Sequence, residues 1–274
     1  MTTLHEGPYI GPMMKTAVRL APVLAAGALL SAATAPSHYI PPNAIDLTKI
    51  LPPAPAKGDI RYEADREVFR AMKARIGSPR WKLATQDVVY ATPVMMRDFS
   101  CAAGIALSPE VTPATYRILA TASADTGHAN VAAKAHWKRL RPFQIDAGET
   151  CEPKEELGGT YDYPSGHTTK GWTFGLVLAD LLPDRATPIL ARARAYGESR
   201  IVCRVHNMSA VEAGRMGATV TMTAIRATPA YQADLAAARA ELAAARRDTP
   251  PPDSAACAAE AALTTPSVLE GLKR

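Results

Sequence analysis

The chain has 274 residues, of which 47% are hydrophobic and 21% are charged, and its formal net charge is +5. This composition excludes a disordered, collagen-like or polytopic membrane protein and allows one globular domain, or at most two. Aromatic residues make up only 6% of the chain, and alanine-rich runs such as 235–247 favour helices over a β-sandwich. We therefore expect an all-α protein with a single helical domain.

The first 35 residues have the pattern of a secretory signal peptide. Lys15 and Arg19 precede an apolar stretch over 20–30, and the residues Ala33-Thr34-Ala35 fit a small-x-small cleavage site. The apolar stretch is shorter than the roughly 20 residues that span a bilayer, so we expect no stable membrane span. The sequence thus predicts a signal peptide over 1–35 and a periplasmic or secreted domain over 36–274.

The mature chain begins with a proline-rich arm over 36–57 that we expect to lie extended over the domain. Apolar spacing and helix-start signals then predict a series of helices over 59–75, 81–96, 112–140, 167–182, 188–200, 210–227 and 231–247. Pro93 should interrupt the second of these, and the third reads as one helix or two. The stretch 167–182 is apolar on several faces, which is typical of a buried central helix. After the prolines at 250–252 we expect only a short tail.

Four cysteines are present, at positions 101, 151, 203 and 257. In an oxidising compartment they would form disulfides, and four cysteines allow three pairings, between which the sequence does not choose. Each is alternatively a small buried hydrophobic residue. Their spacing does not resemble a zinc site, so the sequence predicts no metal.

Three segments concentrate cationic, histidine and turn-forming residues. In the first, Lys134 and Arg141 stand seven residues apart, close to two helical turns, and Pro142 follows as a helix terminator. Both side chains then point from one helix face towards a common anion. A solvated basic face is the alternative. Together with Lys138 and Arg139, these cations are too few to indicate a nucleic-acid partner, and a small anion explains them as well.

The second segment is Tyr163-Pro164-Ser165-Gly166-His167, directly before the predicted central helix. Ser165 is a natural N-cap, and Gly166 lets the backbone approach a ligand closely. The free N–H groups of a helix start bind anions, so this turn predicts a phosphate cradle. His167 beside it can act as a general acid. An ordinary capped helix with a turn histidine is the alternative.

The third segment contributes Ser199, Arg200 and His206. A histidine can attack phosphorus and form a covalent intermediate that water later breaks, although a lone histidine means little. Taken together, the three segments supply two arginines and a lysine to neutralise a phosphoryl group and helix-start amides to hold its oxygens. They also supply one histidine to attack and one to protonate the leaving oxygen. This arrangement needs no metal and no other cofactor.

These motifs resemble a known signature. Lys134-x6-Arg141-Pro142, Pro164-Ser165-Gly166-His167 and Ser199-Arg200-x5-His206 are similar, in order and spacing, to the three-part signature of the type 2 phosphatidic acid phosphatase superfamily, which includes vanadium haloperoxidases. The flanking residues look most like the bacterial class A nonspecific acid phosphatases. The resemblance implies a secreted all-helical enzyme that hydrolyses small phosphate monoesters at acid pH through a phosphohistidine.

Residue roles follow from the same resemblance. His206 would be the nucleophile and His167 the general acid. The phosphoryl oxygens would be bound by Lys134, Arg141, Arg200, Ser165 and Gly166. The expected partner is a small phosphomonoester or inorganic phosphate, not a nucleic acid; the particular substrate and a homo-oligomer are left open.

One position departs from the family pattern, which continues His-x3-Asp, whereas the fourth residue after His206 is Ala210. The family carboxylate orients the nucleophilic ring. Glu212 lies about 240° further round a helix and would need an irregular backbone to reach the ring. Ser209 or a backbone carbonyl can hold the ring without supplying charge. By analogy with a serine-protease triad, loss of the carboxylate costs roughly 10⁴-fold in rate.

Two alternatives to a phosphatase remain open at this stage. Because position 210 lacks the family carboxylate, one alternative is a non-catalytic member of the fold that binds phosphate or another oxyanion without turning it over. Haloperoxidase chemistry with bound vanadate is the other, although the short chain and the class A-like flanks disfavour it. A lipid phosphatase is disfavoured because no predicted transmembrane helices accompany the motifs.

Overall fold

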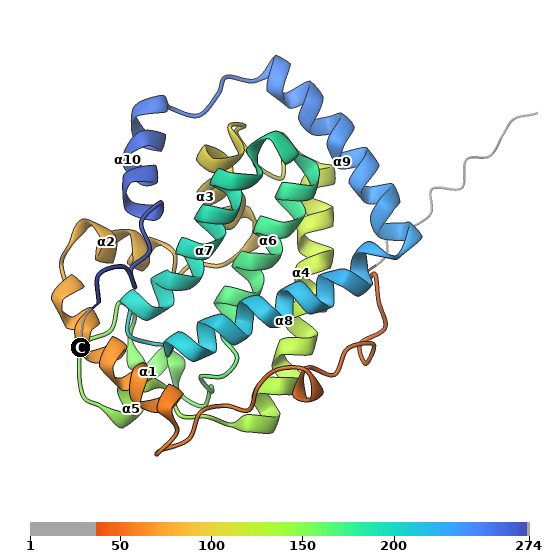
Figure 1. Cartoon of the computed structure of the whole chain (residues 1–274). Coiled ribbons are helices and arrows are strands. Elements are labelled where there is room, and N and C mark those ends of the chain that lie inside the picture. The colour runs from red at the N-terminus through yellow and green to blue at the C-terminus, as the bar shows by residue number, and fades with distance from the viewer. Residues whose placement is uncertain (1–36, 273–274) are drawn as a thin grey trace, which may run out of the picture. The chain divides into compact units, whose positions relative to one another are not determined.

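The computed structural model describes residues 37–272, and every regular element in this range is a helix (Figure 1). The α-helices are α1 (Ile60–Ala71), α2 (Pro79–Gln86), α3 (Thr92–Ala103), α4 (Pro113–Trp137), α5 (Pro142–Ile145), α6 (Gly166–Leu181), α7 (Ala186–Val202), α8 (Met208–Arg226), α9 (Pro229–Asp248) and α10 (Ser254–Thr264). Short 3-10 helices are η1 (Leu47–Lys49), η2 (Met72–Arg75), η3 (Lys154–Leu157) and η4 (Pro183–Arg185). The predicted all-α fold class is confirmed, whereas the predicted signal peptide lies outside the described residues.

Helix α6 is the centre of the fold. It packs against α4, α7 and α8, which surround it in Figure 1, and also contacts α9. Phe174, Val177 and Leu178 of α6 are fully buried in the largest apolar cluster. Burial on several sides explains why this helix is apolar on several faces rather than amphipathic. Within residues 37–272, no helix combines the length and the apolarity needed to cross a membrane.

Two glycines bring α7 and α8 unusually close to the first turn of α6. A Cβ atom at Gly214 of α8 would lie 2.7 Å from the backbone oxygen of Ser165. At Gly197 of α7 it would lie 2.8 Å from the Thr168 side chain. Only glycine allows such an approach without displacing its neighbour. The start of α6 is therefore clamped between α7 and α8, where the site described below is assembled.

The structure corrects several predicted helix boundaries. Instead of one helix over 81–96, α2 and α3 are separate, and Pro93 lies in the first turn of α3. Proline is favoured there because the missing N–H would have no helical partner. The helix predicted over 112–140 is a single helix that ends at Trp137, because Lys138 adopts a left-handed conformation with φ of 48°. The expected tail contains α10, whose start is capped by Asp253.

Both disulfides join segments that are distant in sequence. Cys101–Cys257 links α3 to α10, and Cys151–Cys203 links the loop before α6 to the end of α7. The proline-rich arm contains η1, whose Leu47 is buried together with Leu51 in a cluster that includes alanines of α4. The arm and the tail are thus both fastened to the helical core.

Candidate active site

A cavity of about 730 Å³ lies beside the start of α6. Of the predicted site residues, it is lined by Lys134, Arg141, Gly166, His167 and His206. These residues come from three segments that are well separated in the sequence. Two cations and both predicted catalytic histidines therefore meet at one cavity.

Lys134 and Arg141 reach the cavity by a different route from the predicted one. Lys134 is in the last turn of α4, but the chain reverses at Lys138 and Arg141 becomes the N-cap of α5. The two cations do not share a helix face, so that expectation was wrong. The Lys134 Nζ donates to the Tyr161 carbonyl at 2.6 Å, while Arg141 Nη1 donates to the Val205 carbonyl at 2.9 Å.

The turn before α6 has the predicted cap. The Ser165 hydroxyl accepts a hydrogen bond from the Thr168 backbone N–H at 3.3 Å and is wholly buried. It is absent from the cavity lining among the described residues, so its hydroxyl serves the helix, and Gly166 presents the backbone to the cavity. The helix start adds a partial positive charge there.

His167 is held at the cavity wall by two contacts. Its Nε2 lies 2.9 Å from the Val88 carbonyl, which accepts only a hydrogen bond, so Nε2 carries a proton. The ring also packs against Tyr90 with a centroid distance of 4.2 Å. These contacts leave Nδ1 as the ring nitrogen that can exchange a proton with a ligand.

Arg200 on α7 is fully buried behind the cavity wall. Its Nη2 donates to Glu152, which lines the cavity, while its Nε and Nη1 have no hydrogen-bond partner among the described residues. The disulfide between Cys151 and Cys203 fixes Glu152 beside α7. Because unpartnered buried donors are costly, the N–H groups of these two nitrogens favour a further anionic acceptor at this position.

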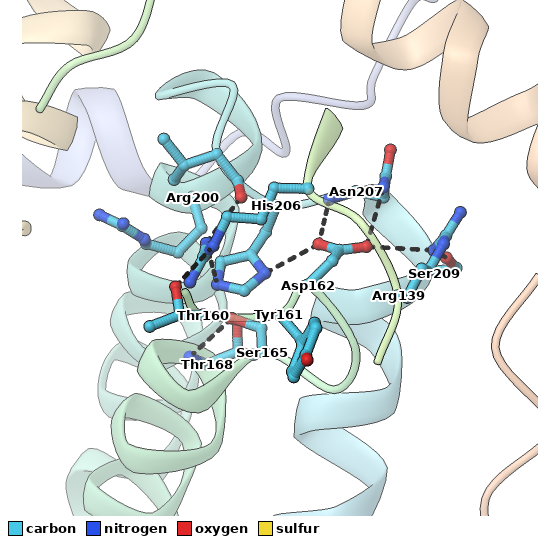
Figure 2. A network of polar contacts seen from close by, with 12 residues as sticks. Arg139, Thr160, Tyr161, Asp162, Ser165, Thr168, Arg200, His206, Asn207 and Ser209 are labelled. Atoms are coloured by element: carbon cyan, nitrogen blue, oxygen red, sulfur yellow. Dashed lines mark hydrogen bonds and ion pairs between the residues drawn. The ribbon is translucent and has the colours of Figure 1, made fainter. Parts of the chain in front are cut away.

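His206 lies between a cation and a carboxylate. Its Nε2 is 3.1 Å from Arg141 Nη1. Its Nδ1 is 2.9 Å from Oδ1 of Asp162 (Figure 2). Sequence reasoning missed Asp162, which stands four residues before Gly166. The lack of a carboxylate at position 210 indicated that a residue elsewhere would have to orient the ring. Only the folded loop, however, shows that Asp162 reaches the ring.

Neither of the other predicted partners holds the ring of His206. The Ser209 hydroxyl donates to Asp65 and accepts from Arg139. Glu212 is on the exposed side of α8 and pairs with Arg215. The polar contact of Nδ1 is therefore with a carboxyl group, and not with the Ser209 hydroxyl or a backbone carbonyl as expected.

The electrostatics of the cavity favour an anion. Burial, with Arg141 nearby, lowers the pKa of Lys134 to about 7, and burial lowers the pKa of Arg141 to about 10. The pKa of His206 is held well below its ordinary value by burial and by the charge of Arg141. Burial and Arg200 do the same to the pKa of His167. The charge of a negative ligand would oppose each of these shifts, because it favours the protonated form.

Comparisons with known proteins show the family of this chain. The model of the PAP2 superfamily matches residues 114–233, which contain all three motifs. An acid phosphatase of Zymomonas mobilis is 38% identical over 216 residues, covering 77% of this chain and 80% of that protein. Non-specific acid phosphatases of Salmonella typhimurium and Providencia stuartii are 35% and 32% identical over 215 residues, covering 77% of this chain and 86% and 87% of their own lengths. The chain therefore belongs to the PAP2 superfamily, in the group of the bacterial acid phosphatases.

Proposed function

We propose that this protein hydrolyses small phosphate monoesters through a phosphohistidine at His206. The observation that carries the proposal is the meeting of two histidines and two cations at one cavity, namely His206, His167, Lys134 and Arg141. The relatives named acid phosphatase support the phosphatase class. The pairing of all four cysteines supports an exported protein, because disulfides persist in oxidising compartments.

The phosphoryl group is bound by charge and by backbone amides. Lys134 and Arg141 at the cavity, with the free N–H groups of Arg200, neutralise its non-bridging oxygens. The start of α6 at Gly166 adds N–H donors and a partial positive charge. Positioning and charge neutralisation of this kind supply most of the catalysis in phosphoryl transfer.

The first chemical step transfers the phosphoryl group to the protein. The lone pair of His206 Nε2 attacks phosphorus while the bond from phosphorus to the ester oxygen breaks. His167, protonated on both ring nitrogens, gives its Nδ1 proton to that oxygen, and the alcohol leaves. The Val88 carbonyl keeps the ring aimed through Nε2 during the transfer.

The second step releases phosphate. His167, now neutral at Nδ1, takes a proton from water as the water oxygen attacks phosphorus. The bond between phosphorus and Nε2 breaks, its electron pair returns to His206, and inorganic phosphate leaves. The two histidines end in their starting protonation states, so the cycle balances without another reactant.

Hydrolysis of an aryl phosphate tests this proposal. The wild-type protein should release phosphate, and His206→Ala should release none above background. His167→Asn should retain more activity towards an ester with an acidic leaving group than towards an alkyl ester, because only the latter needs the proton. Failure of purified, folded protein to release phosphate over the range in which imidazole titrates would overturn the proposal.

The two alternatives lack such support. The non-catalytic anion binder was motivated by Ala210, and the contact between Asp162 and His206 removes that motive. Vanadate-dependent haloperoxidase chemistry predicts halide oxidation that appears only when vanadate and peroxide are both added. The hydrolysis assay run beside that measurement separates the two activities.

A further inference from the structure

The nucleophilic ring proposed above is held by a residue outside the expected pattern. Asp162 and His206 are 44 positions apart in the sequence, and the separation between Asp162 Oδ1 and His206 Nδ1 is 2.9 Å. The exposed fractions of the two residues are 0% and 3%. Such burial excludes water from the contact, so it is a strong and specific hydrogen bond.

Both ring nitrogens of His206 specify the same tautomer. Arg141 has only donors, so its approach to Nε2 at 3.1 Å requires a lone pair on Nε2. The proton of the neutral ring is then on Nδ1, from which it is donated to Asp162. This tautomer keeps the lone pair on Nε2, the nitrogen that must attack phosphorus, and the guanidinium that donates to it here is the one assigned to the phosphoryl oxygens.

The carboxylate of Asp162 is itself held on all sides (Figure 2). Its Oδ1 also accepts from the Asn207 backbone N–H at 3.1 Å. Its Oδ2 accepts from the Asn207 side-chain amide at 2.8 Å and lies 3.2 Å from Arg139 Nη1. Arg139 is anchored in turn by Asp65 at 2.7 Å. Four donors, including a cation and the imidazole, are therefore aimed at Asp162.

Position 210 has a different task in this chain. Ala210 is fully buried in an apolar cluster that includes Tyr163 and Leu47. Its backbone carbonyl accepts from the N–H of Ser165 at 2.9 Å, which joins α8 to the turn before α6. The side chain packs in this cluster, while Asp162 on the loop before α6 provides the carboxylate.

We propose that Asp162 is the positioning residue for the nucleophile, in the role that the family pattern gives to the fourth residue after the histidine. The orienting charge is thus placed on the loop before α6 instead of on α8. The inference rests on the proposed phosphohistidine chemistry. Asp162 acts through His206 by fixing its tautomer and by stabilising the positive charge that develops on the ring.

The variant Asp162→Asn should reverse the tautomer. The charged Arg139 and the Asn207 side-chain amide both donate to the Oδ2 position, whereas only the Asn207 backbone N–H and the imidazole face Oδ1. Because the cation is the strongest of these donors, the carbonyl oxygen of the new amide should face the Oδ2 side. Its NH2 group then faces Nδ1 of His206, which must become an acceptor. The proton moves to Nε2, and the nucleophilic lone pair is lost. We expect kcat to fall by about 10⁴-fold, as for the corresponding change in a serine protease.

Nitrogen-15 spectra of histidine-labelled protein measure the tautomer directly, with His206→Gln used for assignment. Wild type should show a proton on Nδ1 and none on Nε2 of His206, and Asp162→Asn should show the reverse. Asp65→Asn is the matched control, because Asp65 is equally buried and also binds Arg139, whereas the carboxylate on Nδ1 is that of Asp162. The control should keep the wild-type tautomer.

The outcomes separate this inference from the proposed function. A proton on Nε2 in wild type, or an unchanged tautomer and rate in Asp162→Asn, would overturn the role of Asp162 whether or not the protein is a phosphatase. If the variant does not fold, the wild-type spectrum still tests the role, because a proton on Nε2 and none on Nδ1 would exclude donation from the ring to Asp162. A wild type that shows the expected tautomer but releases no phosphate would overturn the proposed function instead.

Discussion

Glu152 pairs with the buried guanidinium of Arg200 at the wall of the cavity. A carboxylate thus occupies one edge of an arginine that we assign to phosphate binding. Because Glu152 and a phosphoryl anion carry like charges and are drawn to the same guanidinium, they oppose one another.

Glu152→Gln should therefore bind inorganic phosphate more tightly. We expect the inhibition constant of phosphate to fall by about tenfold, equivalent to about 1.4 kcal/mol of relieved repulsion. Glu156→Gln is the control, since Glu156 lines the same cavity but is exposed, and it should have a smaller effect. Weaker phosphate binding in Glu152→Gln would mean that Glu152 holds Arg200 in place for the anion rather than competing with it.

The pH dependence should follow from the two histidines, with the loss of the Lys134 charge weakening phosphate binding as the pH rises through its pKa of about 7. Burial holds the pKa of both His206 and His167 well below the ordinary value. His206 must be neutral to attack, so its low pKa keeps it competent in acid. His167 must be protonated to act as an acid, so activity should fall as the pH rises above its pKa. We expect the optimum of kcat/KM on the acid side of neutrality.

Changing the leaving group checks the assignment of that alkaline decline. For an ester whose leaving group needs no proton, kcat/KM of the wild type should fall much less steeply with rising pH. With the same ester, kcat/KM of His167→Asn should not show this fall. A decline that is equally steep for all esters and persists in His167→Asn would show that another group titrates.

Placing the aspartate of the family pattern at position 210 should not raise the rate of hydrolysis. Ala210→Asp places a carboxylate in the apolar cluster around Tyr163, while Asp162 already occupies Nδ1 of His206. Burying a polar group without partners costs about 1–3 kcal/mol, so the unfolding midpoint should fall and kcat/KM should not rise. Ala210→Asn controls for side-chain volume. A large gain in rate for Ala210→Asp alone would contradict the role given to Asp162.

The close approach of α8 to α6 should be measurable as stability. Gly214→Ala puts a methyl group 2.7 Å from the Ser165 carbonyl oxygen, and we expect a loss of about 1–3 kcal/mol in the free energy of unfolding. Gly127→Ala is the matched change on α4, where nothing lies within 4 Å of the new methyl group. Removing a helical glycine there should add about 0.5–1 kcal/mol. Denaturant unfolding compares the two variants. Equal changes in their free energies of unfolding would contradict the close packing of α8 against the start of α6.

The sequence predicted those helix caps and starts that depend only on neighbouring residues. The cap at Ser165 and the start of α6 follow from a few adjacent residues, and their outcome matches the prediction. Pro93 was misread because proline both breaks helices and begins them, and only tertiary packing decides which. The left-handed Lys138 could not be predicted, since lysine has no intrinsic preference for that conformation.

In the site, too, the residues of local motifs were predicted, whereas contacts that depend on the fold were not. Five of the seven residues that the motifs pointed to line the cavity, whereas Ser165 and Arg200 are buried beside it. The idea that Lys134 and Arg141 share a helix face was wrong. Asp162 was missed because its contact with His206 depends on how the loop before α6 meets the start of α8. A one-dimensional pattern fixes spacing along the chain and carries no information on a contact between two loops.

Trapping the phosphoenzyme tests the central claim most directly. Rapid acid-free quenching of wild-type protein during turnover of a radiolabelled aryl phosphate should leave label that is stable to base and labile to acid. Peptide mapping should place this label on His206, and His206→Ala should carry none. Label on any other residue, or rapid turnover with no labelled protein at any quench time, would contradict the account.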